Sequence, residues 1–393
     1  MANEDRATRY HRLRRRASVA ATALGGLFLL VLLVSGGSAA LREAASAATG
    51  GSVPLTLTVY VVCLAAGHEL LQLPLAFYLG IVLERRYGLS TQTTAGWWTD
   101  QGKAGAVGLV LALLGSAVVF SLLAWSPEYW WIAAAAVFSA MLVLLAQLAP
   151  VLLLPLFYDI EPLDRPALAA RLLALAERAG APVLGVFEWR LSGRTRKANA
   201  ALTGIGRTRR ILLSDTLLAE HADDEIEVIL AHELAHHVHR DIWAGIAFET
   251  GLIVAGLFIA DRVVAAFAGP LGLAGKTDLA ALPLIILTMG GVSLLLMPLA
   301  NGFSRAHERR ADRYALDLSS NASAFVSAMR RLAAQNLAEE RPSRLVELLF
   351  HSHPSTSARI AAAQAWETRP LAAPLLSQTL GGSHEEKASD DPR

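Results

Sequence analysis

The residues of this chain best placed to do chemistry form an H-E-x-x-H motif, with His232, Glu233 and His236 in the middle of the sequence. Histidines four positions apart lie on one face of a helix, so both imidazoles can bind a single metal ion. Glu233 then stands beside the first histidine, where its carboxylate can take a proton from a metal-held water. Proteins use this pattern for zinc-dependent peptide hydrolysis. Because a bare H-E-x-x-H also occurs in ordinary helices, the rest of the sequence must indicate whether this one binds a metal.

A catalytic zinc normally has three protein ligands and one open position. His239 shares the motif's helix face, but in a continuous helix it lies about 10 Å along the axis from His232. That distance is too long for one tetrahedral ion, and His237 faces sideways. We therefore expect neither to be a ligand and both to be solvated at the membrane surface.

The composition indicates a membrane protein. Of the 393 residues, 54% are hydrophobic and 18% are charged, and the mean hydropathy is +0.42. Soluble proteins carry about 25% charged residues. The net charge of +1 argues against a nucleic-acid partner, and the single cysteine, Cys63, excludes an intrachain disulfide and a cysteine-based zinc site.

Six apolar stretches reach the roughly 20 residues that a membrane-spanning helix needs. They lie between residues 16 and 42 and at about 54–83, 104–127, 129–158, 242–267 and 278–305. The first follows a basic segment and could be a cleaved signal peptide, but the five later spans favour a retained anchor. The fold class is therefore mainly α, a polytopic membrane protein.

Basic residues predict the orientation of these spans. They concentrate before the first span and in the 84–103 loop, whereas the alternate loops are poor in them. The N-terminus, residues 84–103, residues 159–241 and the C-terminal region are accordingly expected in the cytoplasm. The motif helix then meets the membrane from the cytoplasmic side, in what we expect to be a bacterial plasma membrane.

The soluble segments contain further helices and short strands. Within 159–241 we expect a helix at 165–179 capped by Asp164, strands at 183–191, 198–203 and 210–213, a turn capped by Ser214 or Asp215, and the motif helix at 223–240. Helices are expected at 304–318, 322–339 and 356–366. The chain thus divides into an N-terminal membrane region (1–158, about four spans), a cytoplasmic insertion (159–241), a transmembrane hairpin (242–303), C-terminal catalytic helices (304–380) and a disordered tail (381–393).

Topology offers candidates for a third ligand. The fifth span leaves the cytoplasmic face directly after the motif and the sixth returns at Ser304, so the segment 304–312 begins beside the motif helix. Glu308 and Asp312 are four apart and share a face, so one could bind zinc while the other orients an imidazole N–H. A charged juxtamembrane helix with local ion pairs is the alternative.

These motifs together resemble those of a known protein family. The H-E-x-x-H helix, followed after a transmembrane hairpin by S-R-x-x-E-x-x-A-D, is similar to the integral-membrane gluzincins of the CAAX prenyl protease 1 type and their bacterial heat-shock relatives. Four further segments agree with that family, namely R-Y-G-L-S-T-Q-T at 86–93, P-L-F with E-P-L at 155–163, N-A-x-x-T-G at 199–204 and H-P-x-x-x-x-R at 353–359. The resemblance covers about residues 75–360.

The resemblance implies a ring of about six transmembrane helices around a water-filled chamber, with a cytoplasmic α+β zinc-metalloprotease domain. It implies one Zn²⁺ per chain and a role for each of eight residues. By this resemblance His232, His236 and Glu308 are the ligands, Glu233 is the base, Asp312 orients a ligand, Asn199 holds substrate backbone, and His353 and Arg359 stabilise the oxyanion or order the site.

The chain also departs from the family. The eukaryotic members have seven spans where we count six, Ser90 replaces an asparagine of the Q-T loop, and the soluble insertion is shorter. These differences concern the chamber more than the zinc chemistry. His68 and Glu69, inside the second span, begin like a second motif, but Gln72 stands where a second histidine would be. Because ionisable residues inside a membrane normally face a polar interior, we expect them to line the chamber.

The expected function is zinc-dependent endopeptidase activity on membrane-associated or misfolded proteins. The peptide or protein substrate, lipidated or not, would lie antiparallel along the 198–204 strand, beside membrane lipid. One alternative is dedicated processing of C-terminal CAAX-type prenylated proteins. Another is a non-catalytic membrane receptor or scaffold with a structural zinc, although such a site has no need of Glu233.

Overall fold

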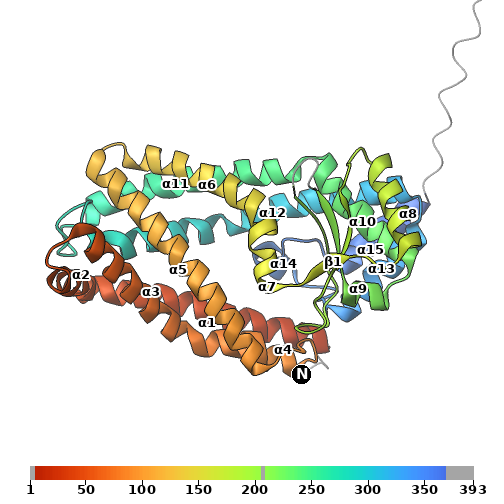
Figure 1. The fold of residues 1–393 in the computed structure, drawn as a ribbon, viewed down its shortest axis with the longest axis horizontal. Coiled ribbons are helices and arrows are strands. Elements are labelled where there is room, and N and C mark those ends of the chain that lie inside the picture. The colour runs from red at the N-terminus through yellow and green to blue at the C-terminus, as the bar shows by residue number, and fades with distance from the viewer. Residues whose placement is uncertain (1–4, 205–208, 369–393) are drawn as a thin grey trace, which may run out of the picture.

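The computed structural model describes residues 5–204 and 209–368, in which long helices form one end of the molecule and an α/β region the other (Figure 1). Six helices in these ranges are long and apolar enough to cross a membrane, which confirms the predicted number of spans. Only 11% to 28% of the residues in their apolar stretches are buried inside the molecule, as expected for helices whose remaining surface is available to lipid or to a cavity between them. The helices that contain these apolar stretches are Arg6–Val34, Val53–Arg86, Thr94–Trp125, Trp130–Ala149, Asp241–Phe267 and Leu279–Ser319.

The first span differs from its predicted bounds. The sequence predicts it between residues 16 and 42, whereas α1 (Arg6–Val34) includes the basic segment and ends earlier. Arginine is a good helix former, so the basic segment continues the helix outside the apolar stretch. Gly36 has a φ of 72°, a left-handed conformation that ends the helix and lets α2 (Gly37–Ala48) turn onto α3 (Val53–Phe77).

The other helices of the membrane end follow in chain order. The second span continues from α3 through a π-helical turn (Tyr78–Val82) into α4 (Leu83–Arg86). The remaining elements are α5 (Thr94–Trp125), α6 (Trp130–Leu152), the short α7 (Leu154–Phe157), α11 (Asp241–Phe267), a 3₁₀ turn (Leu279–Ala281) and α12 (Leu282–Ser319).

A four-stranded sheet in the order β1-β2-β4-β3 lies at the centre of the α/β region. The three predicted strands are present as β2 (Gly185–Trp189), β3 (Ala200–Thr203) and β4 (Arg210–Ser214), while β1 (Ile160–Pro162) was not predicted. β2 and β4 are parallel, and β1 and β3 pair antiparallel to their neighbours. β3 is therefore an edge strand.

Helices surround this sheet and share one apolar core with it, built around Leu172, Ile211, Leu213, Leu234 and Phe325. Ser214 caps the short helix α9, as predicted, but the residue before α8 is Arg165 and not Asp164. The helices are α8 (Pro166–Arg178), α9 (Asp215–Glu220), α10 (Asp223–Val238), α13 (Ala322–Gln335), α14 (Arg344–Phe350) and α15 (Thr356–Glu367).

Two predicted helix bounds near the C-terminus are wrong, and one helix there was not predicted. The helix expected to begin at Ser304 is the second half of α12, which continues from the sixth span without a break. α13 ends at Gln335 and not at residue 339, because Leu337 has a φ of 53°, and α14 was not predicted. The predicted tail 381–393 lies outside the described residues.

Candidate metal centre

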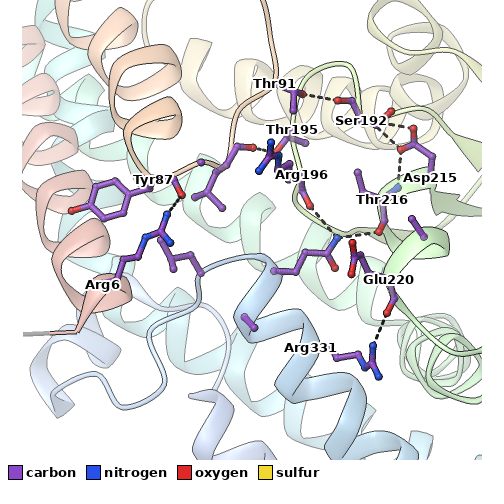
Figure 2. A pocket seen from close by; sticks show the side chains of 16 residues that line it. Arg6, Tyr87, Thr91, Ser192, Thr195, Arg196, Asp215, Thr216, Glu220 and Arg331 are labelled. Atoms are coloured by element: carbon purple, nitrogen blue, oxygen red, sulfur yellow. Dashed lines mark hydrogen bonds between the residues drawn. The ribbon is translucent and has the colours of Figure 1, made fainter.

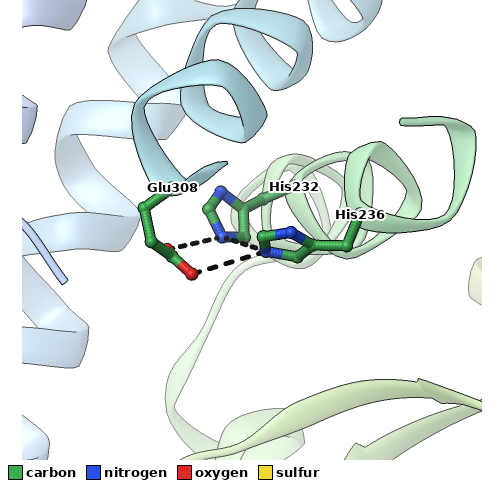
Figure 3. Close-up of side chains that lie close together, drawn as sticks. All are labelled: His232, His236 and Glu308. Atoms are coloured by element: carbon green, nitrogen blue, oxygen red, sulfur yellow. Dashed lines mark hydrogen bonds and ion pairs between the residues drawn. The ribbon is translucent and has the colours of Figure 1, made fainter. Parts of the chain in front are cut away.

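Three predicted site residues meet where α10 packs against α12 (Figure 3). The Nε2 atoms of His232 and His236 are 3.3 Å apart. Glu308 reaches across from α12, with Oε2 3.2 Å from His232 Nε2 and Oε1 3.5 Å from His236 Nε2. One ligand atom from each residue lies within 4.8 Å of the others, so the group could hold a metal ion.

The burial pattern of the two helices explains this meeting. α10 is buried along most of its length, which fixes its rotation and directs both histidines toward α12. On α12 the buried face carries Glu308 and Asp312, one turn apart, and alanines that let the two helices approach closely. The buried residues of these two helices include Leu230, Ala231, Leu234, Ala235, Ala311 and Ala315.

Each histidine is also held by a carboxylate on the far side of its ring. Asp312 Oδ1 lies 2.9 Å from His232 Nδ1, and Asp241 Oδ2 lies 2.9 Å from His236 Nδ1. Such contacts orient a metal-binding imidazole and leave Nε2 as the free lone pair. Asp241 was not among the predicted site residues. Arg240 ends the motif helix with a φ of 57°, and this left-handed turn brings Asp241, the first residue of α11, back to His236.

Arginines neutralise both carboxylates. Arg359 Nη2 lies 2.5 Å from Asp312 Oδ1 and 3.4 Å from His232 Nδ1. Burial opposes ionisation of Asp312, but the contacts with His232 and Arg359 outweigh it and lower its pKa to about 2. Asp241 pairs with Arg310 in the same manner. Both orienting carboxylates are therefore ion-paired and held in place.

The donor set fits a metal ion. With both Nδ1 atoms donating to carboxylates, the two Nε2 lone pairs point at each other and at Glu308. Glu308 Oε2 is buried and accepts no hydrogen bond, which is costly for a carboxylate oxygen unless a cation binds it. Two imidazoles and one carboxylate form the set found in catalytic zinc sites of the thermolysin type.

Glu233 and His353 lie at the same centre. Burial raises the pKa of Glu233, which follows His232 directly in α10. His353 Nε2 lies 3.3 Å from Glu308 Oε1, and its side chain is 61% exposed, so it stands at the open side of the centre. Glu233 thus follows a ligand directly, and His353 lies at the open side with its Nε2 toward Glu308.

Asn199 lies directly before β3 and is exposed. Its backbone pairs with Ser214, donating to Ser214 Oγ and accepting from the Ser214 N–H, each at 2.9 Å. The side chain is therefore free to face a ligand along the sheet edge.

His239 is not part of the metal group found among the described residues. Its ring packs on Tyr314, with centroids 5.4 Å apart, and its Nδ1 is buried, so the side chain is only partly solvated. His237 is half-buried and belongs to no metal group in the described ranges.

His68 and Glu69 line a cavity of about 580 Å³ among the membrane helices, together with Gln101 and Ser116. The cavity is otherwise lined mainly by apolar side chains and glycines of α1, α3, α5 and α12. Polar groups on an apolar wall would let it hold water or an amphipathic chain.

A larger cavity, of about 890 Å³, lies away from the metal group, between the 87–91 loop, the 192–196 loop and α13 (Figure 2). Three of its charged side chains already have partners within the protein, beginning with Arg6, which donates to the Tyr87 carbonyl. Asp215 accepts the backbone N–H groups of residues 191, 192 and 216, and Arg331 donates to the Glu220 carbonyl. We therefore assign the chemistry to the His232 centre.

Comparisons with known proteins agree with this geometry. Residues 162–367 match Peptidase family M48, and residues 2–159 match the CAAX prenyl protease N-terminal family, described as five membrane helices. The uncharacterized metalloprotease YhfN of Bacillus subtilis is 34% identical over 79% of this chain and 74% of that protein. CAAX prenyl protease 1 of Saccharomyces cerevisiae is 29% identical over 76% of this chain and 70% of that protein.

The fold is also similar to a solved one. The crystal structure of S. mikatae Ste24p has a TM-score of 0.82 to this chain at 22% identity, over 91% of this chain and 88% of that one. The spans and the histidine-carboxylate group together define a multi-pass membrane metalloprotease. Because the family match covers more than half of its length, the chain belongs to Peptidase family M48. The resemblance recognised in the sequence is thereby confirmed.

Proposed function

We propose that this protein is a zinc-dependent endopeptidase in which His232, His236 and Glu308 bind one zinc ion per chain and Glu233 is the general base. The observation that carries the proposal is the convergence of three donor atoms within 4.8 Å. When bound, zinc would supply a Lewis acid for the scissile carbonyl and lower the pKa of water toward about 7.

The remaining steps belong to the side chains around the ligands. Glu233 accepts the proton of the attacking water and returns it to the leaving amine. Its raised pKa brings it closer to neutral pH, where a proton acceptor that must also donate works best. His353 donates a hydrogen bond to the carbonyl oxygen as negative charge develops there. Asp312, held by Arg359, keeps the His232 ring in the orientation that directs Nε2 toward the metal.

The substrate would bind as an extended peptide, antiparallel to the free edge of β3. Asn199 is hydrogen-bonded to Ser214 of β4, and hydrogen-bonded residues alternate along an antiparallel pair. The backbone groups of Ala200 and Leu202 therefore point away from β4, toward the free edge. A peptide paired there is recognised by its backbone, which favours broad sequence specificity. Asn199 would add a side-chain contact to that backbone.

The substrate class we favour is membrane-associated or misfolded protein, cleaved at the cytoplasmic face of a bacterial plasma membrane. Processing of prenylated CAAX-type proteins is the second candidate, and it is favoured by the name of the Saccharomyces cerevisiae relative. A receptor with a structural zinc is disfavoured, because a purely structural site needs no carboxylate such as Glu233 beside the ligands.

Metal analysis combined with peptide cleavage tests the mechanism. The purified protein should contain about one zinc per chain, and Glu233→Gln should keep the metal while losing cleavage, because a base and not a ligand is removed. Glu308→Ala should lose the metal, whereas His239→Ala should keep metal and activity. Normal turnover by Glu233→Gln would exclude this mechanism.

A further inference from the structure

The free edge of β3 ends just before the strand begins. There the side chain of Asn336 occupies the backbone groups of Ala198. Asn336, directly after α13, accepts a hydrogen bond from the Ala198 N–H at 2.8 Å through Oδ1. Its Nδ2 donates to the Ala198 carbonyl at 3.2 Å. One amide side chain thus satisfies both backbone groups of Ala198, as a residue of a paired peptide would.

Ala198 belongs to the same outward-facing series as the proposed peptide-binding residues. Asn199 bonds to Ser214 of β4, so Ala198, Ala200 and Leu202 share the opposite side. Ala200 and Leu202 remain for a ligand, whereas Ala198 is taken. The edge that a peptide can use therefore ends between Ala198 and Ala200.

This closure lies beside the metal centre. A cavity of about 340 Å³ is lined by Asn336 together with His353, Arg359, Pro354 and His11. If Asn336 only protected the edge strand from pairing with other chains, it would not need to lie close to the metal centre. The shared cavity means that a peptide leaving the metal toward Ala198 would reach Asn336.

The next step rests on the proposed function and on an antiparallel peptide substrate. We propose that Asn336 is a specificity-determining residue. It limits how many substrate residues on the C-terminal side of the scissile bond can pair with the enzyme. An antiparallel peptide runs against β3, so its C-terminal residues point toward Ala198. The enzyme then gains no backbone pairing from a substrate that extends past Asn336.

A peptide series tests this role. The peptides share their N-terminal part and the cleaved bond, and they lengthen by one residue at a time on the C-terminal side. For the wild type, kcat/KM should stop rising once the peptide reaches Asn336. For Asn336→Ala it should rise further, by about 10-fold for two regained hydrogen bonds. Alanine can adopt the backbone of residue 336, whose φ is −88°.

Gln335→Ala is the matched control. Gln335 Nε2 donates to the carbonyls of Arg196 and Thr216, so its loss loosens the same segment without freeing Ala198. Its length profile should follow the wild type. Asn336→Ser, which is too short to bridge both groups, provides a second variant if Asn336→Ala fails to fold, as judged by bound zinc.

Binding measured in a Glu233→Gln background separates this inference from the proposed function. Peptide affinity there should show the same dependence on length, with and without Asn336→Ala, although no turnover occurs. Equal length profiles for the wild type and Asn336→Ala would overturn the role of Asn336. Length-dependent binding without cleavage by the wild-type enzyme would overturn the endopeptidase and leave this role standing.

Discussion

At the residue scale, the centre is built from two histidines that each have a carboxylate of their own. His232 has Asp312, which the sequence identified because it lies one turn after Glu308. His236 has Asp241, which the sequence analysis missed. The motif predicts a continuous helix over 223–240, but α10 ends at Val238 and a left-handed Arg240 redirects the chain. A single backbone conformation of this kind has no periodic signal in the sequence.

Removal of either carboxylate should weaken zinc binding. Asp241→Ala and Asp312→Ala should each lower zinc affinity or activity by about 10- to 100-fold, because orienting contacts of metal ligands typically contribute that much. Competition with a chelator measures the affinity. Asp317→Ala is the control, since Asp317 lies on the same helix but accepts from Trp366 at 2.7 Å. An unchanged zinc affinity in Asp241→Ala would contradict its assignment.

At the element scale, the proximity of α10 and α12 could be predicted from topology, because the two spans between them must return the chain to one membrane face. The strands β2, β3 and β4 could be predicted from their apolar runs and flanking glycines. The pairing of β1 could not, because three residues carry too little pattern. The continuity of α12 was also missed, since its composition changes from apolar to charged at Ser304 while the helix continues.

The continuity of α12 has a testable consequence. One alanine inserted after Gly302 should turn Glu308 by about 100° relative to the membrane segment. Glu308 would leave the histidines, and zinc binding and cleavage should be lost. One alanine inserted after Gly272, in the loop between α11 and α12, should leave both unchanged. Wild-type zinc content in the Gly302 insertion would mean that α12 is not rigid between the membrane and the site.

At the scale of the whole molecule, an even number of spans places both termini on one face of the membrane, and the basic residues predict which face it is. Composition and apolar length were sufficient to predict six spans, and the structure has six in its described residues. The proposed orientation places the N-terminus, the 84–103 loop and the C-terminus on the cytoplasmic side. Reporter tags at these positions should all be cytoplasmic, and one near Gly272 should report the opposite side. A C-terminal tag outside the cell would contradict the orientation.

The cavity among the membrane helices bears on the choice between the two substrate classes. It measures about 580 Å³ and has His68 and Glu69 in an otherwise largely apolar wall. A farnesyl group could enter it, but backbone pairing at β3 does not require one. We therefore expect kcat/KM for one peptide, measured with and without its farnesyl group, to differ by less than 10-fold. His68→Ala, which alters the cavity and not the metal centre, should leave the rate on the unmodified peptide unchanged. The opposite result would be a preference for the farnesylated peptide above about 100-fold, worth roughly 2.7 kcal/mol, that decreases in His68→Ala. It would mean that the cavity binds the lipid and that the enzyme processes prenylated proteins.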